Sequence, residues 1–146
     1  MLTVIQRVLE ARVEVSGHTV GEIASGMLIL CGFEATDTSS TLNTMLDRCL
    51  NYRIFSDEAG KMNRHLKQTE GGLLLVPQFT LVADTRKGLR PGFSKAAPPA
   101  QGKALFTELT TLARQRYCKV ASGQFGADMQ VYLCNDGPVT FVLSFQ

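Results

Sequence analysis

Two short segments hold the residues best suited to chemistry. Pro77 to Leu81 reads Pro-Gln-Phe-Thr-Leu and offers a hydroxyl at Thr80. Asn135 to Thr140 reads Asn-Asp-Gly-Pro-Val-Thr, and its Gly-Pro pair can form a rigid turn with exposed carbonyl groups because a cis bond is accessible before proline. A hydroxyl can act at a reactive carbonyl, and fixed carbonyls can recognise a ligand. Ordinary roles stay open, since Asn-Asp-Gly is common in hairpin turns and strand hydroxyls usually face water or a neighbouring strand.

The common catalytic motifs do not occur. The chain has no G-x-S-x-G, Walker A, G-x-G-x-x-G or H-E-x-x-H sequence. A Ser-His-Asp triad would need His18 or His65, and neither has an identifiable partner, so we expect both to be solvated surface residues. Neither histidine lies at ligand spacing from a cysteine or from the other histidine. We therefore expect no metal and no other cofactor.

The cysteines and the composition indicate a single intracellular domain. The four cysteines are widely spaced, contain no CxxC pair and are predicted to be buried free thiols; they are Cys31, Cys49, Cys118 and Cys134. With 146 residues, 45% of them hydrophobic and 19% charged, the chain can bury one core. Its apolar stretches are shorter than the ~20 residues of a membrane helix. We expect no membrane span, no signal peptide and a cytoplasmic location.

One loop concentrates positive charge, although the formal net charge is only +2. Arg86, Lys87, Arg90 and Lys95 fall within ten residues, with no acid between them and with glycine and proline around them. Such a segment is either a solvated connection or a contact for nucleic acid.

Apolar periodicity predicts more strands than helices. Strands are expected at 11–15, continuing into a hairpin through Val20 and Ile23, and at 27–33, 53–55, 73–76, 129–133 and 139–145. The 27–33 strand has no polar face and should be central. Pro77 should interrupt the next strand, with 78–82 continuing in extended form, while 135–138 should be the turn between the last two strands. The polar residues from 61 to 72 are expected to form a loop.

Two helices are predicted. N-cap residues at 36–40 precede apolar side chains at helical spacing, namely Leu42, Met45, Leu46, Cys49 and Leu50. The second helix covers 100–117. The expected fold is α+β, a curved, barrel-like and mostly antiparallel sheet with two packed helices in one domain spanning 1–146.

The two segments that opened this section resemble the signatures of the D-aminoacyl-tRNA deacylases, Ser-Gln-Phe-Thr-Leu and Asn-x-Gly-Pro-Val-Thr. The similarity extends along the whole chain, through segments such as 5–8, 52–55, 93–95 and 127–131. It implies a homodimeric hydrolase that cleaves the ester between a D-amino acid and the 3′-terminal ribose of tRNA and also accepts glycine. Pro77 departs from the signature, because it replaces a serine and removes a hydroxyl and a backbone donor.

The resemblance implies catalytic roles for Gln78, Phe79 and Thr80. Backbone N–H groups near Phe79 and Thr80 would stabilise the developing negative charge on the ester carbonyl. No partner that could activate Thr80 is identifiable, so it is expected to position the substrate while water attacks, aided by the ribose 2′-OH.

The resemblance also implies that a second group of residues rejects L-amino acids. The Gly137-Pro138 bond would be cis, and its carbonyls would enter the partner subunit's site and collide with an L side chain. Arg7 would hold this segment, and Met129 would belong to the same substrate-binding group. The basic loop residues Arg86, Lys87, Arg90 and Lys95 would hold tRNA phosphates.

Two alternatives remain open at this stage. The chain could be a nucleic-acid-binding module without catalysis, in which both segments serve only as structure. It could also be an esterase for small molecules with Thr80 as nucleophile, and it would then lose all activity in Thr80→Ala.

Overall fold

A computed structural model describes residues 1–146. The elements follow in the order β1 (Leu2–Val15), β2 (His18–Ile23), β3 (Gly26–Gly32), α1 (Ser39–Asn51), β4 (Phe55–Ser56), β5 (Met62–Arg64), α2 (Leu66–Thr69), β6 (Gly72–Pro77), the 3₁₀ helix η1 (Phe79–Val82), α3 (Pro99–Arg116), β7 (Val120–Ser122) and β8 (Gln130–Ser144).

Strand β1 organises the sheet. One of its edges pairs with β8, while the other pairs with β3 at residues 2–8 and with β2 at residues 11–15, all antiparallel. Strand β3 continues to β6, and β6 to β7, in parallel pairs. The sheet is therefore mixed, and β3 is central between β1 and β6, which confirms the prediction from its lack of a polar face.

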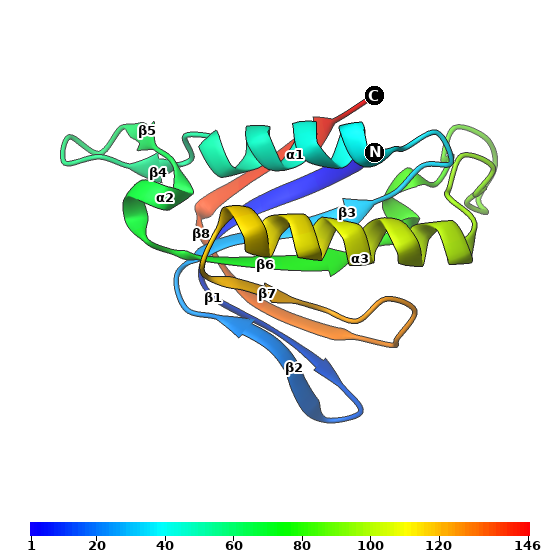
Figure 1. Ribbon diagram of the computed structural model, residues 1–146, viewed down its shortest axis with the longest axis horizontal. Coiled ribbons are helices and arrows are strands. Elements are labelled where there is room, and N and C mark those ends of the chain that lie inside the picture. Colours follow the sequence, from blue (N-terminus) through cyan, green and yellow to red (C-terminus); the bar gives the residue numbers. More distant parts are fainter.

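The sheet curls so that β2 and β7, at the two ends of the strand order, approach each other (Figure 1). Gly21 of β2 approaches β7 so closely that a Cβ at this position would lie 2.4 Å from the carbonyl oxygen of Ser122. No other residue type could occupy this position without moving one of the strands. The result is a nearly closed barrel with helices outside it, which confirms the predicted fold class.

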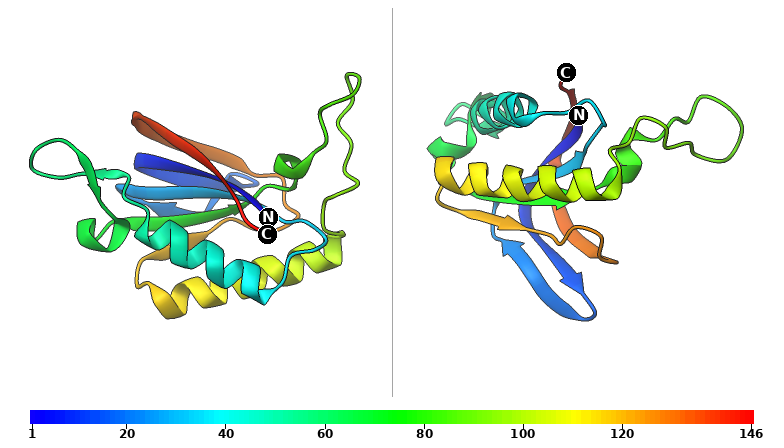
Figure 2. Two further views of the ribbon diagram at one scale, coloured as in Figure 1. Left: turned by 90° about the horizontal axis from the view of Figure 1, so that it is seen from above. Right: turned by 45° about the vertical axis from the view of Figure 1, so that its right-hand side comes forward.

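The alternation of side chains along each strand gives the sheet two buried faces. Helices α1 and α3 cover one face, as Figure 2 shows from above. That face buries Ile5, Met27, Ile29, Leu73 and Leu75 against helical residues such as Met45, Leu46 and Leu109. The other face fills the barrel with Val8, Ala11, Val13, Leu28, Leu74 and Val76.

Both predicted helices are present. Thr38 caps α1, with its N–H donating to the Thr41 hydroxyl oxygen at 3.1 Å. All five apolar residues predicted for its inner face are buried. Helix α3 begins at Pro99, where a missing N–H has no cost because the first helical N–H groups lack intrahelical acceptors anyway.

The predicted final hairpin is wrong, because residues 130–144 form one strand. Both parts of β8 pair with β1 in the same antiparallel sense. Between the pairs Gln6↔Thr140 and Val8↔Asn135, β8 advances five residues while β1 advances two. The segment 135–139 is therefore an outward loop within a single strand and not a turn between two strands.

Two local predictions are also corrected. Residues 79–82 form the 3₁₀ helix η1 and not an extended strand, because the chain turns as soon as Pro77 and Gln78 end the β6 pairing. Residues 61–72, predicted to be loop, contain the short strand β5 and the one-turn helix α2, so the chain has three α-helices.

The polar side chains partly differ from expectation. All four cysteines are free, but Cys118 and Cys134 are exposed, so their predicted burial is wrong. Cys31 and Cys49 are buried, and burial raises the pKa of the Cys49 thiol to about 12. His18 is exposed as predicted, whereas the Nδ1 atom of the half-buried His65 is buried without a partner. No helix has the length and apolarity needed to cross a bilayer.

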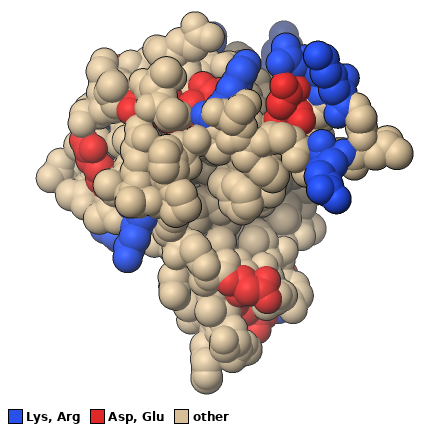
Figure 3. Space-filling view, turned by 90° about the vertical axis from the view of Figure 1, so that its right-hand side faces the viewer, with Lys and Arg blue, Asp and Glu red and all other residues tan.

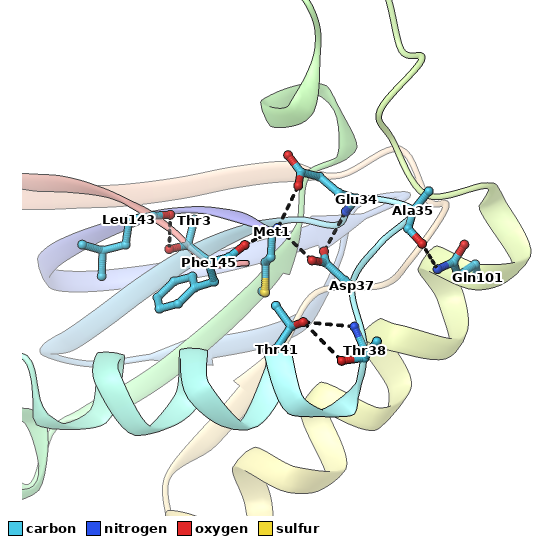
Figure 4. Close-up of polar contacts among 10 residues, drawn as sticks. All are labelled: Met1, Thr3, Glu34, Ala35, Asp37, Thr38, Thr41, Gln101, Leu143 and Phe145. Atoms are coloured by element: carbon cyan, nitrogen blue, oxygen red, sulfur yellow. Dashed lines mark hydrogen bonds and ion pairs between the residues drawn. The ribbon is translucent and has the colours of Figure 1, made fainter.

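A buried charge cluster ties the chain ends to the loop before α1 (Figure 4). The ammonium of Met1 donates to Asp37 Oδ1 at 2.8 Å, to the Phe145 carbonyl at 2.9 Å and to Glu34 Oε2 at 3.2 Å. The loop in turn holds the segment before α3, since the Ala35 N–H donates to the Lys95 carbonyl at 3.1 Å.

Candidate active site

A cavity of about 630 Å³ opens where β6 ends. Val76 to Phe79 form one wall, Phe93 and Ala96 to Pro99 another, and Phe125 to Ala127 with Met129 and Val131 a third. Nine of the fourteen lining residues are hydrophobic, and none is charged. An apolar cavity with few polar groups is the usual form of a site for a small organic group.

The floor of the cavity follows from the end of β6. The Gln78 N–H donates to the Cys31 carbonyl at 2.7 Å, which is the last bond between β6 and β3. The chain then enters η1, where the first internal donor is Leu81, whose N–H reaches the Gln78 carbonyl at 3.2 Å. The N–H groups of Phe79 and Thr80 precede that donor and have no acceptor within the helix.

Thr80 lies beside the cavity and is exposed. Its hydroxyl oxygen accepts a hydrogen bond from the Gln78 side-chain amide and makes no other side-chain hydrogen bond. The hydroxyl proton therefore remains available for an outside acceptor. Since no histidine or carboxylate contacts this hydroxyl, the geometry supplies no base that would turn Thr80 into a nucleophile.

Of the three aromatic residues that line the cavity, only Phe79 was among the predicted site residues, and Phe93 and Phe125 were not. Phe79 is 58% exposed and Phe93 39% exposed, and their ring centroids lie 5.2 Å apart. Phe125 packs from the opposite wall against Gly102 of α3, where a Cβ would lie 2.9 Å from its ring. Phe93, Phe125 and the two prolines at the start of α3 come from separate segments, so no sequence pattern links them. Exposed aromatic rings near a predicted site segment are the only available signal.

The segment containing Gly137 and Pro138 lies beside Arg7. Their peptide bond is cis, and both residues are exposed. Arg7 Nε lies 3.2 Å from Asp136 Oδ2 and donates to the Asp136 carbonyl at 3.3 Å, while Nη1 donates to the Ile54 carbonyl at 2.9 Å. Arg7 thus fastens the segment to the loop after α1.

Gly137 has no room for a side chain. Its φ angle is +124°, and a Cβ would lie 2.8 Å from Val139 Cγ2 and 3.0 Å from Arg7 Nη2. The Asn135 side chain closes the segment by accepting from the Val139 N–H at 3.2 Å and donating to the Thr140 hydroxyl at 2.8 Å. The backbone here is held in a shape that other residues would strain.

Within one chain these two regions lie apart. Gly137 and Pro138 do not line the cavity, whereas Gln78, Phe79 and Met129 do. At this end of the sheet, the pairs Pro77↔Cys31, Thr3↔Cys31 and Thr3↔Leu143 separate the cavity floor from the C-terminal part of β8 by three strand spacings, whereas Val131 at the start of β8 lines the cavity. With about four residues of offset along β1, the separation is on the order of 20 Å.

Three of the four basic residues, Arg86, Lys87 and Arg90, lie on a projecting loop, and Lys95 follows it (Figure 2). Asp84 and Gly92 close it through two backbone bonds of 2.7 and 3.0 Å. Arg86 is not free, because its guanidinium binds both carboxylate oxygens of Asp84 at 2.9 and 2.7 Å and lowers the pKa of that carboxyl far below its usual value. Figure 3 shows Lys and Arg side chains gathered on this projection. Lys87, Arg90 and Lys95 are exposed and form no ion pairs.

Comparison with known proteins places this nearly closed mixed barrel in a class of hydrolases, the D-aminoacyl-tRNA deacylases. The chain matches the family described as D-Tyr-tRNA(Tyr) deacylase over residues 4–144 and belongs to that family. The D-aminoacyl-tRNA deacylase of Legionella pneumophila (strain Lens) is 63% identical over 145 residues, covering 99% of this chain and 100% of the relative. That of Ectopseudomonas mendocina (strain ymp) is 61% identical over 143 residues, covering 98% and 99%.

Solved structures share this architecture. The c-Myc DNA unwinding element binding protein superposes with a TM-score of 0.94 at 37% identity, covering 99% of this chain and 98% of its own. A probable eukaryotic D-amino acid tRNA deacylase superposes with a TM-score of 0.83 at 18% identity and shares the fold, with 97% of each chain covered.

Proposed function

We propose that this enzyme hydrolyses the ester that joins a D-amino acid, or glycine, to the 3′-terminal ribose of tRNA, and that it spares the L ester. The observation that carries the proposal is the uncharged cavity lined by Gln78 and Phe79, with Thr80 next to them in the chain, in a protein that belongs to the deacylase family. An aminoacyl ester is already activated, so the protein needs to orient it and to stabilise charge.

The reaction requires stabilisation of a tetrahedral oxyanion. The N–H groups of Phe79 and Thr80 would donate to the carbonyl oxygen as it becomes negative, a contribution of several kcal/mol in such sites. Water, aided by the ribose 2′-OH, would attack the carbonyl carbon, and the ester C–O bond would break as the ribose oxygen takes a proton. Thr80 would position the substrate through its free hydroxyl proton. No metal is required in this scheme, so the rate should not fall in EDTA.

We further propose that the active form is a homodimer. Val4 and Val142 pair across β1 and β8 on the sheet face that α1 and α3 leave uncovered, and Val142 is 64% exposed. An apolar sheet face of this kind is suited to a second copy of the chain. Because the exposed Gly137 and Pro138 are too far from their own cavity, they would enter the cavity of the partner.

Selection of D-aminoacyl over L-aminoacyl esters would then depend on steric exclusion of the L side chain. The carbonyl groups of the partner's Gly137 and Pro138 would lie against the α-carbon of the bound amino acid. An L side chain would collide with this wall, a D side chain would point away from it, and glycine would pass because it has no side chain. The cytoplasm, where charged tRNA is used, is the proposed location.

The projecting loop is proposed to hold phosphates of the acceptor end. Replacing Lys87 and Arg90 by Ala should weaken tRNA binding and reduce the slope of log affinity against log salt by about 1 to 2, because up to two phosphate contacts are lost. Filter binding from low to high salt measures both effects. Arg86→Ala alone should have a smaller effect, since Arg86 is already paired with Asp84.

The matched control is Lys61→Ala with Lys67→Ala, which removes the same charge from the β4–β5 connection and from α2, at the end of the molecule away from the loop (Figure 1). Equal effects of the two double variants would show that net charge, and not the loop, governs binding.

The test of the proposed function is deacylation of D-Tyr-tRNA, L-Tyr-tRNA and Gly-tRNA by the purified protein in EDTA. We expect rapid loss of the D and Gly acyl groups, with the L ester spared. Equal cleavage of D and L esters would contradict exclusion. RNA binding without turnover would identify a binding module. Cleavage of small esters that disappears in Thr80→Ala would identify a Thr-nucleophile esterase.

A further inference from the structure

Pro77 leaves one hydrogen bond of the sheet unmade at the edge of the cavity. Between β6 and β7, the Leu73 N–H donates to the Lys119 carbonyl at 2.8 Å, and the Gly123 N–H donates to the Leu75 carbonyl at 2.8 Å. In a parallel pair with this register, the next donor is residue 77 and its acceptor is the Gly123 carbonyl. Proline has no N–H, so the series stops there.

The unmade bond lies at the start of a cavity wall. A Cβ on Gly123 would lie 3.4 Å from Pro77 Cδ and 2.9 Å from Met129 Sδ, so the Gly123 backbone packs directly on the proline ring and on Met129. Pro77 and Met129 both line the cavity, as do Phe125, Gly126 and Ala127. The wall formed by residues 123–129 therefore begins where the sheet bonding ends.

Few other contacts restrain this wall. The Gln124 N–H reaches Met129 Sδ at 3.4 Å, and the Ala127 N–H donates to the Gln124 carbonyl at 3.3 Å, so both bonds are internal to the wall. The Gly123 N–H is its remaining backbone bond to β6, and Phe125 anchors it against Gly102 of α3. A segment with so few backbone bonds to the rest of the fold opens at low cost.

We propose that Pro77 is a positioning residue: by withholding a hydrogen bond from the Gly123 carbonyl, it lets the 123–129 wall move and adapt the cavity to aminoacyl groups of different size. The adaptation to substrate size rests on the proposed function. The mobility of the wall does not, because it is argued from the missing donor and from the few backbone bonds that tie the wall to the rest of the fold.

Two substitutions separate the donor from the side chain. Pro77→Ala restores the N–H and removes the ring, and Pro77→Ser does the same and adds a hydroxyl, so the two variants share the donor and differ in the hydroxyl. Both should slow amide exchange at residues 124–128 by about 3- to 10-fold, the effect expected of one added hydrogen bond. Exchange of β3 amides serves as the reference for global stability. Pro99→Ala is the matched control, because Pro99 lines the same cavity but lacks only a helix N-terminal donor, so exchange at 124–128 should not change.

Kinetics then test the link to substrate size. In both Pro77 variants, the ratio of kcat/KM for D-Tyr-tRNA to that for Gly-tRNA should fall at least about threefold, because a stiffer wall disfavours the larger acyl group. Unchanged exchange, or slower exchange in Pro77→Ser alone, overturns the role of the missing donor. Slower exchange with an unchanged ratio overturns the role in adapting to size. If no ester is cleaved at all, the proposed function fails, and hydrogen exchange still decides whether Pro77 frees the wall.

Discussion

Replacing Asp37 by Asn is expected to lower the free energy of unfolding by about 3 kcal/mol, the lower end of the usual cost of removing one partner of a buried ion pair. The Asp37 side chain is 2% exposed and lies 2.8 Å from the buried ammonium of Met1. Its other oxygen accepts from the Glu34 N–H at 2.7 Å. An Asn side chain has one acceptor oxygen for these two donors, and the ammonium loses its buried counter-charge.

Urea unfolding measures this prediction as a lower transition midpoint with an unchanged slope. Glu34→Gln is the matched control, because it removes the same charge from the same ammonium. The Glu34 side chain is 32% exposed and 3.2 Å away, so its loss should cost less than about 1 kcal/mol. Equal losses in the two variants would show that burial of Asp37 is not what makes this pair stabilising.

Patterns within a single element predicted structure well. The spacing of Leu42, Met45, Leu46, Cys49 and Leu50 located α1, because a helix that packs on one face repeats its apolar residues every three or four positions. The continuous apolar run at 27–33 likewise predicted a central strand, since a strand buried on both faces has no reason to alternate.

Pairing between strands that are far apart in the sequence could not be predicted from such local patterns. Strand β1 begins at Leu2, but Gln6 and Arg7 interrupt its apolar alternation, so only 11–15 was predicted. Asn135 to Pro138 carries strong turn chemistry, and nothing local shows that the residues on both sides pair with the same edge of β1. Turn propensity describes the backbone of a segment and does not specify which strands lie beside it.

The residues of the candidate site could also be predicted only in part. Gln78, Phe79 and Met129 meet in one cavity, whereas the walls supplied by Phe93 and Phe125 depend on how distant loops fold together. Arg86 looked equivalent to its basic neighbours, but the ion pair with Asp84 sets it apart. Composition identifies a charged loop, while only the three-dimensional arrangement shows which of its charges remain available.

Two variants that are each inactive are expected to regain deacylation activity when one subunit of each forms a mixed dimer. Phe79→Pro removes a proposed oxyanion donor, and proline is compatible with the first position of a helical turn, so η1 should persist. Loss of one such donor typically lowers kcat 10²- to 10³-fold. Phe79→Ala is its control, since it removes the ring but keeps the N–H. If the main-chain group matters, the proline variant should be much less active than the alanine variant.

Gly137→Ala alters the Gly137-Pro138 segment, which is proposed to enter the cavity of the partner subunit. A φ of +124° and contacts of 2.8 and 3.0 Å around its Cβ position force the segment to move away from Val139 and Arg7. The displaced segment would then obstruct the partner's cavity instead of only excluding L side chains, so we expect loss of D-Tyr-tRNA deacylation, with a strain cost of about 1 to 3 kcal/mol in stability. Gly17→Ala is the control, because Gly17 also has a positive φ of +78° but has no atom within 4 Å of its Cβ position.

Mixing the two variants decides whether a site draws on both chains. If Phe79 acts in its own subunit and Gly137 in the partner's, each mixed dimer contains one doubly altered site and one unaltered site. Equal mixing makes half the dimers mixed, so deacylation of D-Tyr-tRNA should recover to about a quarter of the wild-type rate after unfolding and refolding together. If both residues served the same cavity of one chain, each chain would remain defective and the mixture would stay inactive. A mixture that stays inactive, although cross-linking detects mixed dimers, would therefore rule out donation of the Gly137-Pro138 segment across the subunit interface.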